Sequence, residues 1–148
     1  MPGPFVHELR VRYGECDPQG IVFNANYLLY FDVAFTELWR AAVGPWQQMV
    51  ALGVDAVVAE AHLSFRTPAR YDDELELRAE IVRLGRTAIT TGIDVVRAGE
   101  LLVAGRLRHV CVSTPSAADS MRSRPWPPEI RAGLARYLSE SSDEGSPT

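Results

Sequence analysis

An acidic residue in a tight turn stands directly ahead of a long apolar segment. In CDPQGIVFNANY, residues 16–27, Asp17 and Gly20 occupy the first and last positions of a type I turn, with proline second. A carboxylate can attack a carbonyl carbon directly, or it can act as a general base on water. The free N–H groups at the start of a helix can stabilise the oxyanion that such an attack creates. The turn is therefore predicted to direct Asp17 toward the first turn of the helix that follows.

The segment after the turn predicts one nearly all-apolar helix. In residues 27–43, YLLYFDVAFTELWRAAV, the few polar side chains form one narrow stripe, and the rest of the helical surface is apolar. Gly44 and Pro45 end this helix, and residues 46–52 predict a short second one. Because a helix with so little polar surface needs other structure around it, a curved sheet is expected to wrap it.

Alternating apolar and polar residues predict an antiparallel sheet. The five expected strands lie at about 5–13, 55–66, 74–84, 87–97 and 100–113. Gly85 and the pair Ala98-Gly99 mark hairpin turns, so the later strands should be neighbours in the sheet. A closing helix is expected at 128–138. The fold class is therefore α+β, and because five strands cannot cover both the helix and the two sheet faces, an oligomer is expected.

The totals of the chain exclude several classes of function. At 148 residues it amounts to one domain, expected to span 1–138, with a polar and disordered tail at 139–148. The net charge of −4 argues against a nucleic-acid binder, and no stretch approaches the ~18 apolar residues of a membrane span. Two cysteines and three histidines show no ligand spacing, so no metal site is predicted. Because the chain opens without a signal peptide, a cytoplasmic location is expected.

Three stretches carry a family resemblance: VRYGECDPQGIVFNANYLLYFDVAFTELW, SFRTPARYDDELEL and RLGRTAITTGIDV. They resemble the hotdog-fold thioesterases of the 4-hydroxybenzoyl-CoA thioesterase family, and also the acyl-CoA thioesterases associated with the Tol-Pal system. The resemblance covers about residues 5–138. It implies a hotdog fold, in which a five-stranded antiparallel sheet wraps around a long central helix and a short C-terminal helix follows. It also implies homodimers joined edge to edge, homotetramers built from them, and active sites at the subunit interface.

The resemblance also implies roles for individual residues. Asp17 corresponds to the catalytic carboxylate, and the backbone N–H of Asn24 to the donor that polarises the thioester carbonyl. Many relatives have a histidine near Asn24, but a backbone donor survives its replacement by asparagine. The substrate-binding residues implied are Gly20, Ile21, Val22 and Tyr27 beside the turn, and Phe65, Thr67 and Pro68 from the partner subunit. The phosphates of coenzyme A are expected to meet Arg70, Arg83 and Arg86.

The expected activity is hydrolysis of a small aryl or aliphatic acyl-CoA to the free acid and CoA, without a metal or redox cofactor. Asp17 would act as a nucleophile or as a general base. Two other functions stay open: a hotdog hydratase or dehydratase, and a non-catalytic acyl-CoA sensor. The hydratase needs a histidine paired with an acid near the helix start, and the absence of histidine between His7 and His62 counts against it.

Each candidate residue also has a purely structural interpretation. Asp17 suits an Asx cap of its own turn. Asn24 and Asn26 suit helix N-caps, and Tyr27 suits the core. Cys16 is expected to point to the face opposite Asp17, which argues against a cysteine nucleophile.

Overall fold

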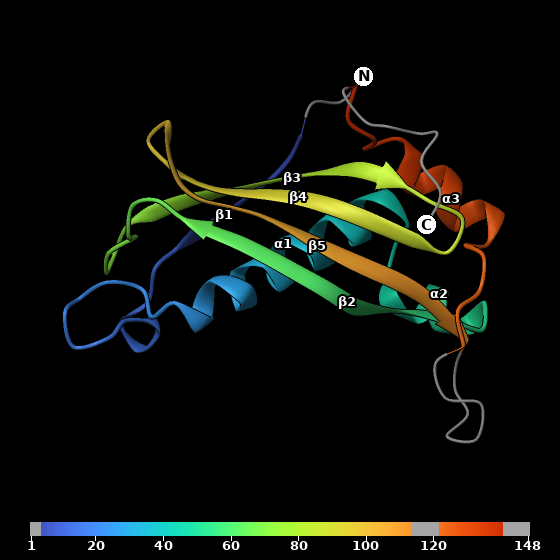
Figure 1. The fold of residues 1–148 in the computed structure, drawn as a ribbon, viewed down its shortest axis with the longest axis horizontal. Helices are drawn as coiled ribbons and strands as arrows, with labels where there is room; N and C mark the ends of the chain where they lie inside the picture. Colours follow the sequence, from blue (N-terminus) through green and yellow to red (C-terminus); the bar gives the residue numbers. More distant parts are fainter. Residues whose placement is uncertain (1–3, 114–121, 141–148) are drawn as a thin grey trace.

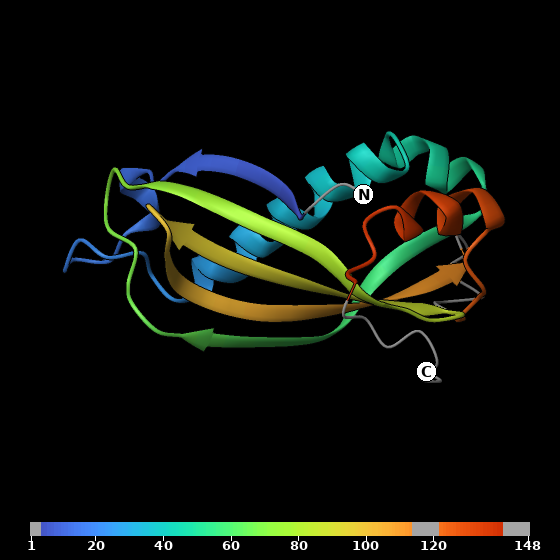
Figure 2. The ribbon, with the colours of Figure 1, turned by 90° about the horizontal axis from the view of Figure 1, so that it is seen from above.

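A single antiparallel sheet curves around one long helix. The structure, a computed structural model, describes residues 4–113 and 122–140. Within these residues five strands pair in the order β1-β3-β4-β5-β2: β1 Phe5–Arg10, β2 Val54–Phe65, β3 Glu74–Leu84, β4 Ala88–Arg97 and β5 Glu100–Ser113. The helices are α1 Ala25–Ala42, α2 Trp46–Ala51 and α3 Pro128–Ala135. Figure 1 and Figure 2 show α1 lying across one face of the sheet, which confirms the predicted fold class.

Helix α1 packs on the sheet along one of its own faces. Its buried positions recur every three or four residues: Tyr27, Tyr30, Phe31, Ala34, Phe35, Leu38, Trp39 and Ala42. Leu77 and Ile93, on the central strands, are fully buried in the same core. Gly105 of β5 permits the closest approach, because a Cβ there would overlap the ring of Phe31. The core therefore lies between α1 and the inner face of the sheet.

The C-terminal end of α1 is held by α3. The guanidinium of Arg136 donates to the carbonyl oxygens of Ala41 (3.0 Å) and Ala42 (2.9 Å), which the end of a helix otherwise leaves unsatisfied. Gly133 approaches Ala42 so closely that a side chain at that position would collide with the main chain of α1. Helix α3 and Arg136, which directly follows it, thus hold the C-terminal end of α1 in place.

One side of α1 and one edge of the sheet stay uncovered in a single chain. Leu28 and Leu29 of α1 are 45% and 51% exposed. No described strand pairs with the outer edge of β2, and Val58 and Phe65 on that strand are each more than half exposed. One chain therefore wraps its central helix only in part, which is consistent with the expected oligomer.

The first strand is shorter than predicted. It ends at Arg10 because the N–H of Val11 donates to the carbonyl oxygen of Asp73, in a loop, at 2.9 Å. A short 3₁₀ helix, η1 (Tyr13–Glu15), follows instead of further strand. The chain therefore leaves the sheet before it reaches the turn that carries Asp17.

The C-terminal boundary also differs from the prediction. Helix α3 ends at Ala135, and Leu138 then forms a bridge to Ile81. Ser139, predicted to begin a disordered tail, is buried, and its N–H donates to the carbonyl oxygen of Ile81 at 2.7 Å. The packed part of the chain therefore extends past residue 138, and residues 141–148 lie outside the described residues.

Replacing Ala98 with asparagine should raise the free energy of unfolding by about 1 kcal/mol. Ala98 and Gly99 form the two-residue turn between β4 and β5, and both have positive φ, 48° and 83°. Asparagine adopts this conformation more readily than alanine does, because its side chain can hydrogen-bond locally. Urea denaturation would measure the gain, and Ala98→Val should shift the midpoint in the opposite direction. A loss in Ala98→Asn would contradict the turn geometry.

Candidate active site

The turn predicted at Asp17 is present. The N–H of Gly20 donates to the carbonyl oxygen of Asp17 at 2.9 Å, and Gly20 has a φ of 80°, which favours glycine. Oδ1 of Asp17 accepts the N–H of Gln19 at 2.8 Å, so the carboxylate caps its own turn. Oδ2 makes no hydrogen bond to any described residue, and the side chain is half-buried. One oxygen of this acid is therefore held in place while the other is available for chemistry.

The turn is bonded to the loop that follows β2. The N–H of Val22 donates to the carbonyl oxygen of Ala69 (2.9 Å), and the N–H of Tyr71 donates to that of Gly20 (3.1 Å). The N–H of Ala69 in turn donates to the hydroxyl oxygen of Tyr27 (2.9 Å), which lies in the first turns of α1. Tyr27 is 3% exposed, so it is a core residue that also joins the helix to this loop.

An ion pair fixes the far side of the same loop. The carboxylate of Asp73 accepts a hydrogen bond from the guanidinium of Arg97 (2.7 Å) and another from the N–H of Arg70 (2.8 Å). Burial alone would raise the pKa of Asp73, but the hydrogen bonds from Arg97 and Arg70 and the charges of these two arginines together outweigh it, and the pKa lies below its usual value. Asp73 is therefore ionised at neutral pH and keeps the loop attached to β4.

A buried carboxylate that was not predicted from the sequence lies two residues before Asp17. Glu15 accepts hydrogen bonds from the N–H of Arg12 (2.8 Å), from its guanidinium (2.6 and 2.9 Å), and from the hydroxyl of Tyr30 (2.8 Å). Burial alone would raise the pKa of Glu15, but these bonds outweigh it and hold the pKa below its usual value. Glu15 is therefore an anion that ties the end of β1 to α1.

The main chain of Glu15 positions the start of the helix. Its carbonyl oxygen accepts the N–H of Phe23 (3.0 Å) and the side-chain amide of Asn26 (2.8 Å). Asn26 is therefore not the predicted N-cap, and Asn24, which occupies the N-cap position, makes no capping bond with its side chain. The N–H of Asn24 finds no acceptor among the described residues. An unused amide thus stands at the N-terminus of α1, where an oxyanion donor is needed.

An apolar groove opens at this end of the helix. Its volume is about 430 Å³, and its lining consists of Ile21, Val22, Asn24, Tyr27, Phe65, Arg66, Thr67, Pro68 and Val103. All of these except Arg66 and Val103 were predicted as site residues. Phe65 reaches the groove because β2 ends there, and its ring lies 5.6 Å from that of Tyr27. The groove offers an apolar acyl group a place beside the Asn24 amide.

Three predicted residues take part in the groove of their own chain. Phe65, Thr67 and Pro68 were expected to contribute to the site of a partner subunit, and within a single chain they line the groove together with Asn24. Their position follows from the bonds that attach their loop to the turn after Asp17. Asp17 itself lies in the adjoining turn and not in the groove lining.

The three predicted arginines are separated from one another. Arg70 is exposed beside the turn, where it forms a bridge with Ile21. Arg83 lies near the end of β3 and Arg86 in the turn before β4, at the opposite end of the sheet from Asp17 (Figure 1). A single chain therefore does not bring Arg83 and Arg86 to the groove.

Cys16 is poorly placed to act as a nucleophile. Its Sγ lies 3.8 Å from the carbonyl oxygen of Arg12. Burial, with the nearby carboxylates of Glu15 and Asp17, raises the pKa of the Cys16 thiol, so the thiolate is scarce at neutral pH. Within the described residues, no cluster of His, Cys, Asp or Glu could hold a metal ion, and no helix is long and apolar enough to span a membrane.

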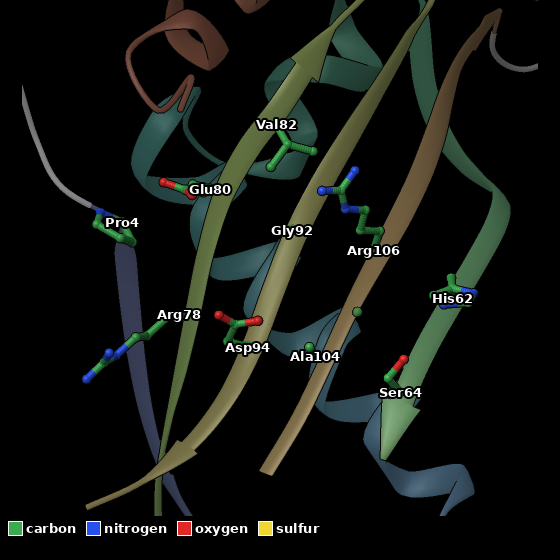
Figure 3. Close-up of a pocket in the computed structure, with 11 residues that line it drawn as sticks. Pro4, His62, Ser64, Arg78, Glu80, Val82, Gly92, Asp94, Ala104 and Arg106 are labelled. Carbon is green, nitrogen blue, oxygen red and sulfur yellow. The ribbon is translucent and has the colours of Figure 1, made fainter. Parts of the chain in front are cut away.

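A second hollow lies on the outer face of the sheet, away from α1 (Figure 3). Its volume is about 440 Å³, and small residues such as Gly92 and Ala104 line it. The side chain of Arg106 extends across β4 beside Gly92, and Asp94 projects from β4 nearby. Because the sheet separates this hollow from the start of α1, it is not the candidate active site.

Glu15→Gln should lower the free energy of unfolding by about 2 kcal/mol, because a neutral amide bonds Arg12 and Tyr30 more weakly than a carboxylate does. Urea denaturation at pH 7 would measure the loss. Glu37→Gln is the matched control, since its pair with Arg40 is longer, 3.4 Å, and the side chain of Glu37 is more exposed than that of Glu15, 28% against 10%. The control should change stability by less than about 0.5 kcal/mol. Equal losses in the two variants would contradict the structural role of Glu15.

Comparison with known proteins identifies the family and the fold. A family model described as the thioesterase superfamily matches residues 19–104. A putative esterase from Aquifex aeolicus is 30% identical over 109 residues, 74% of this chain and 85% of its own. The acyl-CoA thioester hydrolase YbgC of Escherichia coli O157:H7 is 32% identical over 105 residues, 70% and 78% of the two chains. The crystal structure of the hypothetical protein TT1821 from Thermus thermophilus matches with a TM-score of 0.80 and 31% identity, covering 89% of this chain and 98% of that one. The protein therefore belongs to the thioesterase superfamily and has the hotdog fold that its sequence predicted.

Proposed function

We propose that this protein hydrolyses acyl-CoA thioesters to a free acid and CoA. Asp17 acts as the nucleophile or the general base, and the backbone N–H of Asn24 donates to the oxyanion. The observation that carries the proposal is the unused amide of Asn24 beside an apolar groove. The turn that holds Asp17 is bonded to the loop that forms one wall of that groove, so the acid and the amide share one support.

Two routes use these groups and give the same products. In the nucleophilic route, a carboxylate oxygen of Asp17 bonds to the carbonyl carbon, the C–S bond breaks, and the thiolate takes up a proton. Water then opens the mixed anhydride, which releases the acid and restores Asp17. In the general-base route, Asp17 accepts a proton from water as that water attacks, and the departing thiolate takes up a proton. Each route forms an oxyanion, for which one positioned donor lowers the barrier by about 3–4 kcal/mol. Neither route uses a metal or a redox cofactor.

The substrate class follows from the groove and from the relatives. Its lining is mostly apolar, and its volume of about 430 Å³ suits a small aryl or aliphatic acyl group rather than a bulky one. The Escherichia coli relative is named an acyl-CoA thioester hydrolase, which supports coenzyme A as the thiol that leaves.

A homodimer joined through β2 forms part of this proposal. Among the described residues, no strand pairs with the outer edge of β2, and the 12 residues of this strand are a length that favours pairing with a second copy. Antiparallel pairing of two β2 strands reverses the second sheet end for end. It would bring the β3–β4 turn of the second copy, with its Arg83 and Arg86, toward the Asp17 end of the first, where CoA phosphates need cations. Sedimentation would test the dimer and any homotetramer built from it.

A non-catalytic acyl-CoA sensor is the second candidate. The observation that favours it is the bond from the N–H of Gln19 to Oδ1 of Asp17, because a capping role alone would account for this acid. A hydratase has less support, since no histidine lines the groove that the described residues form.

A panel of acyl-CoAs with a thiol reagent tests the proposal. The expected result is the release of free CoA from at least one short aliphatic or aryl acyl-CoA, at a rate proportional to enzyme concentration. Calorimetry on the same panel would detect binding independently. Tight binding without release of thiol would establish the sensor and overturn the hydrolase.

A further inference from the structure

Next to the residues that line the groove, an aromatic ring packs on bare backbone. Val103 of β5 lines the groove, and the next residue of β5 on the same face is Gly105. A Cβ on Gly105 would overlap the ring of Phe31, so this ring lies directly against the main chain of β5. Phe31 is fully buried and belongs to the core, not to the groove lining.

On α1, as on β5, a residue that lines the groove is followed on the same face by one that lies in the core. Tyr27 lines the groove, and Phe31 lies one turn further along the same face of α1. On the neighbouring strand, Leu63 of β2 is paired with Gly105 and packs against the core. The space that is open between Tyr27 and Val103 is therefore filled one layer deeper by the Phe31 ring.

The wall formed by Tyr27 is not free to swing aside. Its hydroxyl accepts the N–H of Ala69, and its ring packs edge-on against Tyr30 at a centroid distance of 5.9 Å. A ligand that needed more depth would have to displace Phe31 from Gly105, because Tyr27 is held at both ends.

We propose that Phe31, seated on Gly105, limits the length of the acyl group and makes this protein selective for short-chain and single-ring acyl-CoAs. The proposal rests on the proposed thioesterase function. Asn24 and Phe31 are seven residues apart, which corresponds to about 10 Å along the helix axis. An acyl chain whose carbonyl lies at the Asn24 amide meets the Phe31 ring within that distance. Phe31 is therefore a specificity-determining residue, because its ring limits how far an acyl chain can extend into the protein.

Acyl-CoAs of increasing length test this limit in the full chain. For the natural sequence, kcat/KM should fall at least about tenfold from hexanoyl-CoA to dodecanoyl-CoA, and benzoyl-CoA should behave as a short substrate. In Phe31→Leu, which removes the ring but keeps an apolar side chain, the dodecanoyl-to-hexanoyl ratio should rise at least about fivefold.

Phe35→Leu is the matched control. Phe35 is one turn deeper on α1 and equally buried, but its ring stacks on His109 and not on Gly105. This variant should lose comparable stability and keep the ratio of the natural sequence. A change of ratio in Phe35→Leu equal to that in Phe31→Leu would assign the effect to general loosening of the core and overturn the proposal.

Thioether analogues separate this inference from the proposed function. S-hexyl-CoA and S-dodecyl-CoA cannot be hydrolysed, and the shorter one should bind at least about tenfold more tightly, as measured by calorimetry. Hydrolysis without a length preference would overturn the inference and leave the thioesterase in place. A length preference in binding without any hydrolysis would support the depth limit set by Phe31 and overturn the thioesterase function. Absence of both preference and hydrolysis would overturn the two together.

Discussion

Replacement of Asp17 by asparagine should reduce kcat by about a thousandfold or more, with a much smaller change in KM. Asparagine is neither a nucleophile nor a base, yet its Oδ1 can still accept the N–H of Gln19 that now bonds the carboxylate. The turn should therefore survive, and the variant should unfold at a urea concentration close to that of the natural sequence. Steady-state hydrolysis of the best acyl-CoA of the panel measures the loss.

Asp72→Asn is the control for this experiment. Asp72 is an exposed acid in the loop bonded to the Asp17 turn, and its φ of 71° is one that asparagine tolerates well. The control should keep kcat within about twofold, because surface substitutions away from the site have small effects. If Asp17→Asn kept most of its activity, the acid would be a turn cap and nothing more.

The stability of the protein should fall as pH drops from about 6.5 to about 4 because of His109. Its imidazole is 2% exposed and stacks on the ring of Phe35 at a centroid distance of 3.7 Å. Burial lowers the pKa of His109 from 6.5 to about 4, because a charged imidazole loses its hydration in the core. Below pH 6.5 the imidazole of His109 takes up a proton in the unfolded chain but stays neutral in the folded chain. This difference should cost about 2 kcal/mol at pH 5 and nothing at pH 7.5 or above.

The variant His109→Leu isolates this contribution. Urea denaturation at pH 7.5 and pH 5 gives two free energies of unfolding for each protein, and their difference should be smaller by about 2 kcal/mol in the variant. His62→Asn is the control, since this histidine lies exposed on β2 and outside the core. If the free energy of unfolding of His109→Leu depended on pH as that of the natural sequence does, protonation of this buried imidazole would not be the cause of the loss of stability in acid.

The fold was predictable because its signals are local. The period-two alternation from Glu74 to Ile81 fixes which residues of β3 face the core, and the apolar character of α1 fixes that it must be buried. The pair Ala98-Gly99 likewise predicts a hairpin through its residue types, wherever that hairpin lies in the sheet. The positive φ angles of both residues confirm the turn. Such signals do not depend on distant residues. Five strands and a central helix could therefore be predicted without knowing how they are arranged in space.

The geometry of the candidate site was predictable only where it too is local. The turn at Asp17 and the start of the helix at Asn24 belong to one short stretch of chain, and the structure contains both. Glu15 was missed because its meaning depends on Tyr30, fifteen residues later, whose hydroxyl reaches it only after the helix has packed. A charged residue next to other polar residues looks solvated in a sequence, and burial appears only in three dimensions.

The groove formed within one chain depends on a contact of a related kind. Phe65 and its neighbours line it beside their own Asn24 because the bond from the N–H of Val22 to Ala69 holds their loop against the turn. No pattern of residue types predicts a main-chain hydrogen bond between two loops. Contacts of this kind depend on where strands happen to end, which sequence spacing alone does not specify.

The contact between Arg136 and the last turn of α1 has a mechanical consequence for catalysis. Helix α1 contains 18 residues and is about 27 Å long, with the Asn24 amide next to one end and Ala42 at the other. A packed helix moves as a nearly rigid body, so a shift at its C-terminal end is transmitted to its N-terminal end. In the proposed mechanism, the short C-terminal helix would therefore help to set the alignment between the amide and the carbonyl oxygen of the thioester.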